Sequence, residues 1–203
     1  WLNASLFINS PAFLERCGKL FQELNVKPEI EAFDPGMIAN AAYYLKKGVL
    51  KAPLHFQFCM GCANGIPGSV KNLVFMKETM DQLCPGSTWS TFGVGHSAME
   101  IMYAAVALGG HIRVGMEDNV MYSKGVLADS NAQFVERAAR VIREYGNEVA
   151  TSAEAREILG LAPLDHEAVV KALDALTIED LEKAKAEACE KYGTTYFAAK
   201  SMG

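Results

Sequence analysis

The sequence lacks the segments that place a protein in a membrane or mark it for secretion. It contains no uninterrupted apolar run of about 18 residues, the length that a membrane-crossing helix needs. The visible N-terminal stretch also lacks the charged and apolar regions of a signal peptide. We therefore expect neither a membrane segment nor a secreted protein.

Excess positive charge is also missing. The chain has 19 Lys and Arg residues against 24 Asp and Glu residues, which gives a net charge of −5. The basic residues are scattered along the chain, whereas a nucleic-acid or membrane-surface partner requires them to cluster. We expect no nucleic acid and no membrane among the partners of the protein.

Disulfide-framework spacing is absent as well. The five cysteines are Cys17, Cys59, Cys62, Cys84 and Cys189. An odd number of cysteines with apolar neighbours in a chain of this length is typical of a reducing compartment, so we expect a cytoplasmic location. Cys59 and Cys62 form one Cys-x-x-Cys pair without the second pair that a structural zinc site would need, which favours small buried cysteines.

What is present is an alternation of strand and helix patterns. Strands are expected at 28–33, 54–59, 88–92 and 111–116, with helices at 37–47, 69–80 and 97–108 between them. Strand–helix units in series indicate parallel strands joined by right-handed crossovers. A complete (β/α)8 TIM barrel needs eight such units and about 250 residues. The fold class is therefore α/β, with the chain as the C-terminal half of a TIM barrel; an open flavodoxin-type sheet is the structural alternative.

The length and the first residue agree with a partial barrel. The chain has 203 residues and begins with Trp1 instead of methionine, so we expect further sequence upstream. We assign residues 1–161 to the half-barrel and 162–203 to a helical C-terminal extension.

Helix-start signals divide the C-terminal part of the chain. Ser130 with Gln133, Thr151 with Glu154, and Thr177 with Asp180 each have the spacing of a capping box. We expect a helix to begin at each of these three places, and a loop to lead from the fourth predicted strand to Ser130.

Side-chain parity along the last strand separates apolar from polar residues. In the segment 111–117, Ile112, Val114 and Met116 share one face, and the polar residues His111, Arg113 and Glu117 share the other. The same parity puts Glu31 and Gln57 on the polar side of earlier strands. Charged groups inside a barrel must pair or bind a ligand, because burial without a partner is costly.

Two interpretations of these inward charges remain open. One is a structural ion pair between Glu31 and Arg113. The other is a functional site, because Glu117 and Asp118 follow the carboxyl end of a strand, where TIM barrels place their active sites. Two adjacent acids at that position repel each other unless a cation lies between them.

Several segments in chain order resemble the β-keto acid cleavage enzymes. The strongest is Arg113-Val-Gly-Met-Glu-Asp-Asn119 followed by Ser123-Lys-Gly-Val-Leu127. The others are 7–13, 31–34, 36–40, 53–58, 65–67, 89–90 and 151–159. The resemblance covers roughly residues 5–161 and leaves out 162–203.

The resemblance implies a zinc-dependent acyltransferase. Such an enzyme converts a β-keto acid and acetyl-CoA to acetoacetate and a new acyl-CoA. Zinc would be held by a His-x-His pair and the glutamate of the last-strand motif, which is Glu117 here. This sequence contains no His-x-His, so the resemblance places that pair in the expected upstream half. It also implies a homo-oligomer.

The same resemblance implies roles for other residues. Asp118 would be the general base, and Arg113 paired with Glu31 would orient it. Independently of the resemblance, Gly93 and Gly95 in the loop after the third predicted strand would let the backbone approach a bound ligand. With the neighbouring His96, we expect them to contact the acetyl-CoA co-substrate.

Two loops depart from the family pattern. The first contains Cys59 to Cys62, and the second has His96 where many relatives carry arginine. Both affect substrate identity more than reaction type. Two other functions stay open: a non-catalytic half-barrel subunit, and a metal-dependent TIM-barrel lyase of the aldolase kind, which would not depend on CoA.

Overall fold

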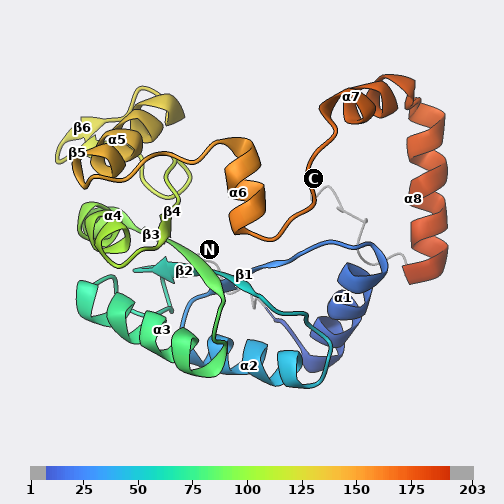
Figure 1. Cartoon of the computed structure of the whole chain (residues 1–203), viewed down its shortest axis with the longest axis horizontal. Helices are drawn as coiled ribbons and strands as arrows, with labels where there is room; N and C mark the ends of the chain where they lie inside the picture. Colours follow the sequence, from blue (N-terminus) through green and yellow to red (C-terminus); the bar gives the residue numbers. More distant parts are fainter. Residues whose placement is uncertain (1–7, 193–203) are drawn as a thin grey trace, which may run out of the picture. The chain divides into compact units, whose positions relative to one another are not determined.

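The computed structural model of the chain describes residues 8–192 and divides it into two compact units, 1–161 and 162–203 (Figure 1). Phe7, the first residue of one motif quoted above, and residues 193–203 lie outside the described part. None of the helices within that part has the length and apolar character needed to cross a bilayer.

The first unit is built on a four-stranded parallel sheet. Its strands are β1 (Glu29–Ala32), β2 (His55–Met60), β3 (Thr88–Gly93) and β4 (His111–Ile112), and they lie in the order β1-β2-β3-β4. Sequential order with parallel pairing means that each crossover moves the chain one strand along the sheet in the same direction.

The helices that connect the strands cover one face of this sheet. They are α2 (Pro35–Lys46), α3 (Val70–Leu83) and α4 (Ala98–Ala107), with the short helix η1 (Gly95–Ser97) just before α4. The main apolar core lies between these helices and the face that carries Ala32, Phe56, Phe58 and Trp89. The described residues form no apolar core on the opposite face, which differs from a flavodoxin-type sheet with helices on both sides.

Helix α5 (Asn131–Glu144) continues this layer beside α4. Met102 and Val106 of α4 pack against Ala138 and Val141 of α5, and Ile112 and Val114 contact this second cluster. The predicted parity of Ile112 and Val114 is therefore confirmed.

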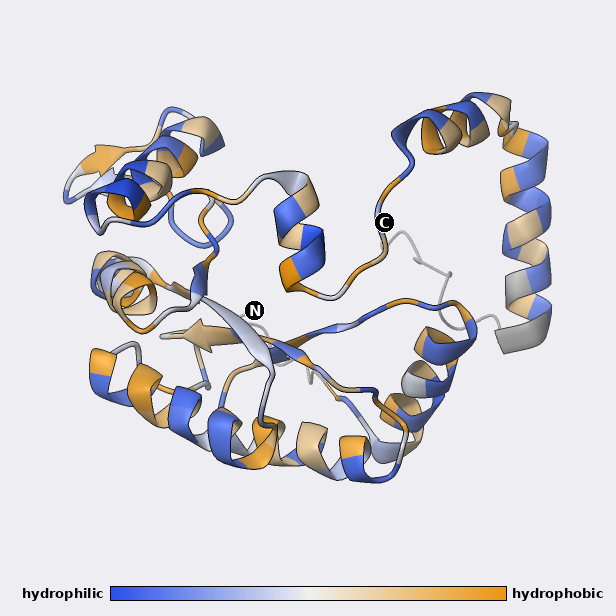
Figure 2. Cartoon of the chain, in the orientation of Figure 1, coloured by the Kyte–Doolittle hydropathy of each residue, from blue (hydrophilic) through white to orange (hydrophobic). Residues whose placement is uncertain are grey.

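Local sequence explains where the helices begin. The side chains of Ser10, Asp34 and Ser69 accept a backbone N–H at the starts of α1 (Pro11–Glu23), α2 and α3. The predicted capping box at α6 (Ser152–Ile158) is confirmed, since Thr151 and Glu154 each bind the other's backbone N–H. In Figure 2 these helices carry hydrophobic and hydrophilic residues in alternation, as expected of helices that pack on one side.

Three local predictions were wrong. The fourth strand ends at Ile112 instead of Met116, because the amides of Asp118 and Asn119 fold back onto the Gly115 carbonyl. Gln133 does not cap Ser130, since its side chain accepts from the Asp129 N–H at 3.2 Å. The segment expected to be a loop forms the antiparallel hairpin of β5 (Met121–Ser123) and β6 (Val126–Leu127).

The second unit contains α7 (His166–Ala175) and α8 (Ile178–Tyr192). The predicted helix start at Thr177 is confirmed, because Thr177 and Asp180 exchange side-chain to backbone hydrogen bonds.

His55 marks the amino-terminal end of the sheet on the face away from the core. It is 8% exposed, with Nδ1 2.9 Å from Thr88 Oγ1 and Nε2 3.3 Å from Glu29 Oε2. Burial, together with the smaller effect of the charges of His111 and Lys27, lowers the pKa of His55 from 6.5 to about 4. The effect of burial on the pKa of His55 outweighs the opposite effect of the Glu29 carboxylate. That carboxylate is half exposed, and burial raises its own pKa.

We expect acid to destabilise the protein through His55. Below pH 6.5 the unfolded chain takes up a proton at this histidine, whereas the folded chain keeps it neutral down to about pH 4, so stability falls as the pH falls through that window. Between pH 7 and pH 5 the full-length wild type should lose about 2 kcal/mol more than His55→Gln. Urea unfolding at both pH values measures this, with the exposed His166→Gln as the control. Equal losses in wild type and His55→Gln would contradict the assignment.

Candidate active site

The candidate active site lies at the carboxyl ends of β1 and β4 and is centred on Arg113. Its Nη1 donates to Glu31 Oε1 at 3.1 Å, and its Nη2 donates to Glu117 Oε2 at 3.1 Å. The guanidinium also binds both oxygens of Asp118, from Nε at 3.1 Å and from Nη2 at 2.9 Å. The sequence-based pairing of Arg113 with Glu31 is confirmed, and one cation joins three carboxylates.

The three carboxylates differ in their access to solvent. The side chain of Asp118 is 6% exposed, whereas that of Glu31 is 47% and that of Glu117 is 87% exposed. Burial raises the pKa of Asp118 more than its hydrogen bonds to Arg113 lower it. Asp118 is therefore a stronger base than an ordinary aspartate, held in a fixed orientation.

The ring of Phe92 supports the side chain of Arg113. Its guanidinium carbon lies 4.4 Å from the centroid of the Phe92 ring on β3. Phe92 and Arg113 lie on the same face of the sheet, opposite the main core, as parity predicted for Arg113. The stacking limits the guanidinium to positions from which it can reach the turn after β4.

Two asparagines that sequence reasoning missed shape the turn at 115–119. Asn131 Oδ1 accepts from the Met116 N–H at 2.7 Å, so the first residue of α5 ties down the turn. Asn119 Nδ2 donates to the Gly93 carbonyl at 2.8 Å, and its Oδ1 accepts from the Gly95 N–H at 2.6 Å. Neither residue belongs to a metal or acid–base pattern, so no signal in the sequence marked these bonds.

These bonds give structural reasons for the glycines of the loop after β3. A Cβ on Gly93 would lie 2.9 Å from the Ser97 carbonyl oxygen, and Gly95 has a φ of +62°. His96 is exposed beside them. The predicted contact of Gly93, Gly95 and His96 with the co-substrate stays a prediction.

The Cys59–Cys62 loop borders the same site. Both cysteines are free, Cys59 buried and Cys62 half-buried. Burial raises the pKa of both thiols, and the charges of Glu31 and Asp118 raise it further. The two residues are therefore neutral thiols beside the carboxylates, as the interpretation of small buried cysteines requires.

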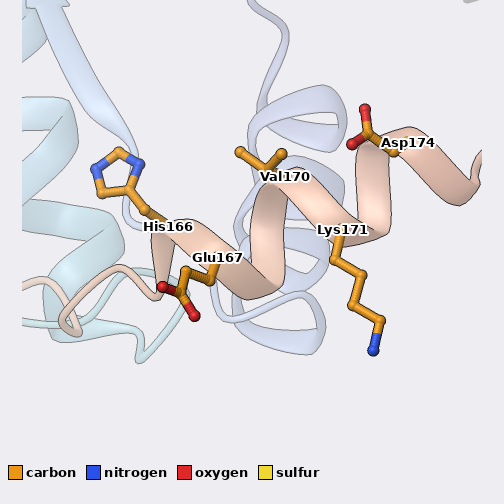
Figure 3. Close-up of a pocket in the computed structure, with 5 residues that line it drawn as sticks. All are labelled: His166, Glu167, Val170, Lys171 and Asp174. Atoms are coloured by element: carbon orange, nitrogen blue, oxygen red, sulfur yellow. The ribbon is translucent and has the colours of Figure 1, made fainter.

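A hollow on the second unit does not resemble an active site. It runs along α7 and is lined by His166, Glu167, Val170, Lys171 and Asp174 (Figure 3). The labelled side chains come from one helix and point in different directions, so no two polar groups converge on a common point.

The fold is that of an α/β protein in which helices cover one face of a parallel sheet. The charged cluster lies at the carboxyl ends of the strands, where such folds carry their catalytic residues. The family model described as beta-keto acid cleavage enzyme matches residues 1–161, and the chain belongs to that family.

Individual relatives agree with this family. The 3-keto-5-aminohexanoate cleavage enzyme of Fusobacterium nucleatum subsp. nucleatum is 45% identical over 156 residues, which are 77% of this chain and 56% of that protein. The 3-oxoadipate:acetyl-CoA acetyltransferase of Cupriavidus necator is 38% identical over 160 residues, 79% of this chain and 56% of that protein. The chain thus spans about half the length of the curated relatives it matches.

Solved structures share the fold. The apo structure of ObcA superposes with a TM-score of 0.66 at 19% identity, over 76% of this chain and 41% of that one. At this identity the likeness concerns the fold alone.

We expect Asn119 to fix the loop after β3 to the turn after β4. In the full-length protein, Asn119→Ala leaves the Gly95 N–H and the Gly93 carbonyl without their side-chain partner, which should lower the free energy of unfolding by about 1–3 kcal/mol. Denaturant unfolding measures the change, and the exposed Asn147→Ala serves as the control. A change in Asn119→Ala no larger than in the control would show that the clamp contributes nothing.

Proposed function

We propose that residues 1–161 are the C-terminal half of a TIM barrel of a β-keto acid cleavage enzyme. The sequential order of the strands, the one-sided cover of helices and the match to about half of each relative support this assignment. The extension 162–203, the homo-oligomer and the cytoplasmic location stay predictions.

The proposed reaction transfers an acyl group between a β-keto acid and acetyl-CoA. The α-carbon of the β-keto acid forms a bond to the carbonyl carbon of the acetyl group, and the bond from that carbonyl carbon to the CoA sulfur breaks. The bond between the original keto carbon and the α-carbon also breaks. The acyl group leaves on the CoA sulfur, so the products are acetoacetate and a new acyl-CoA. The relatives named as acetyl-CoA transferases support acetyl-CoA as the co-substrate.

The arrangement of Asp118 carries this proposal. The reaction needs a base that removes a proton from the carbon between the keto and carboxylate groups. A carboxylate has about four lone-pair positions, and Arg113 occupies one on each oxygen of Asp118, so positions remain for a substrate proton. Arg113 would keep Asp118 ionised and aimed, and Glu31 would hold Arg113 from the side of β1.

The described residues do not complete a zinc site. Within residues 8–192 no three His, Cys, Asp or Glu side chains are placed to hold a metal ion. Glu117 has the exposed carboxylate that a metal could take as one ligand, but catalytic zinc needs about three from the protein. We therefore propose Glu117 as one zinc ligand, with the other ligands from outside the described residues.

A non-catalytic role is the second candidate, because ion pairs between Arg113 and its carboxylates also connect β1 to the turn after β4, as a purely structural cluster would. An aldolase-type lyase is a third, and independence from CoA would distinguish it.

We expect the full-length protein to form acetoacetate from acetyl-CoA and a member of a panel of β-keto acids. Asp118→Asn keeps the size of the side chain and removes the base, so kcat should fall by about 10²–10⁴-fold. The control is Asp81→Asn, at the end of α3 away from the site, which should leave kcat unchanged.

Two outcomes would contradict the proposal. Absence of acetoacetate with every β-keto acid supports the structural role, and product formation without acetyl-CoA supports the lyase. The zinc content of the same preparations tests the metal separately. Bound zinc that is lost in Glu117→Ala supports Glu117 as a ligand, whereas an unchanged zinc content in that variant contradicts this assignment.

A further inference from the structure

Two arginines of α5 converge on a tyrosine of the β5–β6 hairpin. The guanidinium carbon of Arg137 lies 3.3 Å from the centroid of the Tyr122 ring. Arg137 and Arg140 lower the pKa of the Tyr122 phenol, as nearby hydrogen-bond donors and through their positive charge. Arg140 follows Arg137 by three residues on α5, so the two side chains leave the same face of this helix.

Neither arginine is neutralised by a neighbouring acid. In the part of the chain that the structure describes, no carboxylate forms an ion pair with Arg137 or Arg140. Two cations gathered without an anion repel each other, so the arrangement favours a bound anion with several acceptor oxygens.

Contacts with three elements fix the position of these groups. Arg137 Nη1 lies 3.2 Å from Met99 Sδ of α4, and the Tyr122 ring packs on Phe134 of α5 at a centroid distance of 6.0 Å. Arg137 is half-buried among these contacts, whereas Arg140 is exposed. The Tyr122 and Arg137 side chains are thus preorganised, and Arg140 is free to reach a ligand from solvent.

The cluster lies next to the candidate active site. Tyr122 follows Asp118 by four residues, so their Cα atoms are at most about 14 Å apart. Between them, Asn119 holds the loop after β3 through Gly93 and Gly95. This separation is within reach of the pantetheine arm that joins the thioester of acetyl-CoA to its phosphates.

We propose that Arg137, Arg140 and Tyr122 bind a phosphate group of the CoA co-substrate at the mouth of the site. This inference rests on the proposed function for its ligand. The guanidiniums donate to phosphate oxygens in the forked geometry that arginine offers, and the phenol donates a further hydrogen bond. The thioester then extends past Asn119 toward Asp118.

The test compares two acetyl donors with the full-length protein. Acetyl-pantetheine has the thioester and the arm of acetyl-CoA but lacks the diphosphate, the ribose phosphate and the adenine. Arg140→Gln should raise the KM for acetyl-CoA by at least about tenfold and leave the KM for acetyl-pantetheine unchanged. Arg143→Gln, an exposed arginine of the same helix, should change neither value.

Other outcomes separate this inference from the proposed function. An unchanged KM for acetyl-CoA in Arg140→Gln, or an equal rise for both donors, overturns the phosphate site while the proposed reaction stands. If the wild type shows no turnover, calorimetric titration with CoA decides: binding that weakens in Arg140→Gln but not in Arg143→Gln supports the site, and any other result, including no binding to the wild type, overturns it.

Discussion

The charge of Arg113 is the interaction on which the candidate site depends. Glu31, Glu117 and Asp118 come together around this one guanidinium, and two of them are adjacent in the chain. Without a cation between them, three carboxylates at this separation would repel one another and take up protons. Arginine suits this position because its planar group carries five N–H donors in a fixed fork, whereas the ammonium of lysine is a compact point charge with three.

The surrounding backbone holds the Arg113 guanidinium within reach of its three carboxylate partners. Arg113 directly follows β4, and its amide still donates to the Thr91 carbonyl of β3 at 3.0 Å. The chain then leaves the sheet and turns, so Glu117 and Asp118 return toward the same guanidinium. Asn119 and Asn131 hold this turn from both sides, which couples the site to α5 and to the loop after β3. A change in any of these contacts is expected to move the carboxylates.

Sequence patterns predicted the elements whose side chains have a single clear periodicity. The strands around Phe56 and Trp89 and the pairing of Arg113 with Glu31 followed from alternation of apolar and polar residues. Sequence could not predict contacts that depend on where separate elements meet. Asn119 binds a loop about 25 residues earlier in the chain, and Arg137 contacts Tyr122 only because the hairpin folds against α5. Basic residues scattered in the sequence can therefore gather in space, which inspection for basic clusters did not detect.

Replacing Arg113 by lysine tests the central claim most directly, because the charge remains while the fork is lost. In the full-length protein, Arg113→Lys should fold as the wild type does, shown by circular dichroism and unchanged oligomer size. Its kcat for acetoacetate formation should nevertheless fall by at least about a hundredfold, since Asp118 loses its two-point contact. A variant that keeps wild-type turnover would contradict the account and leave Arg113 as a source of charge alone.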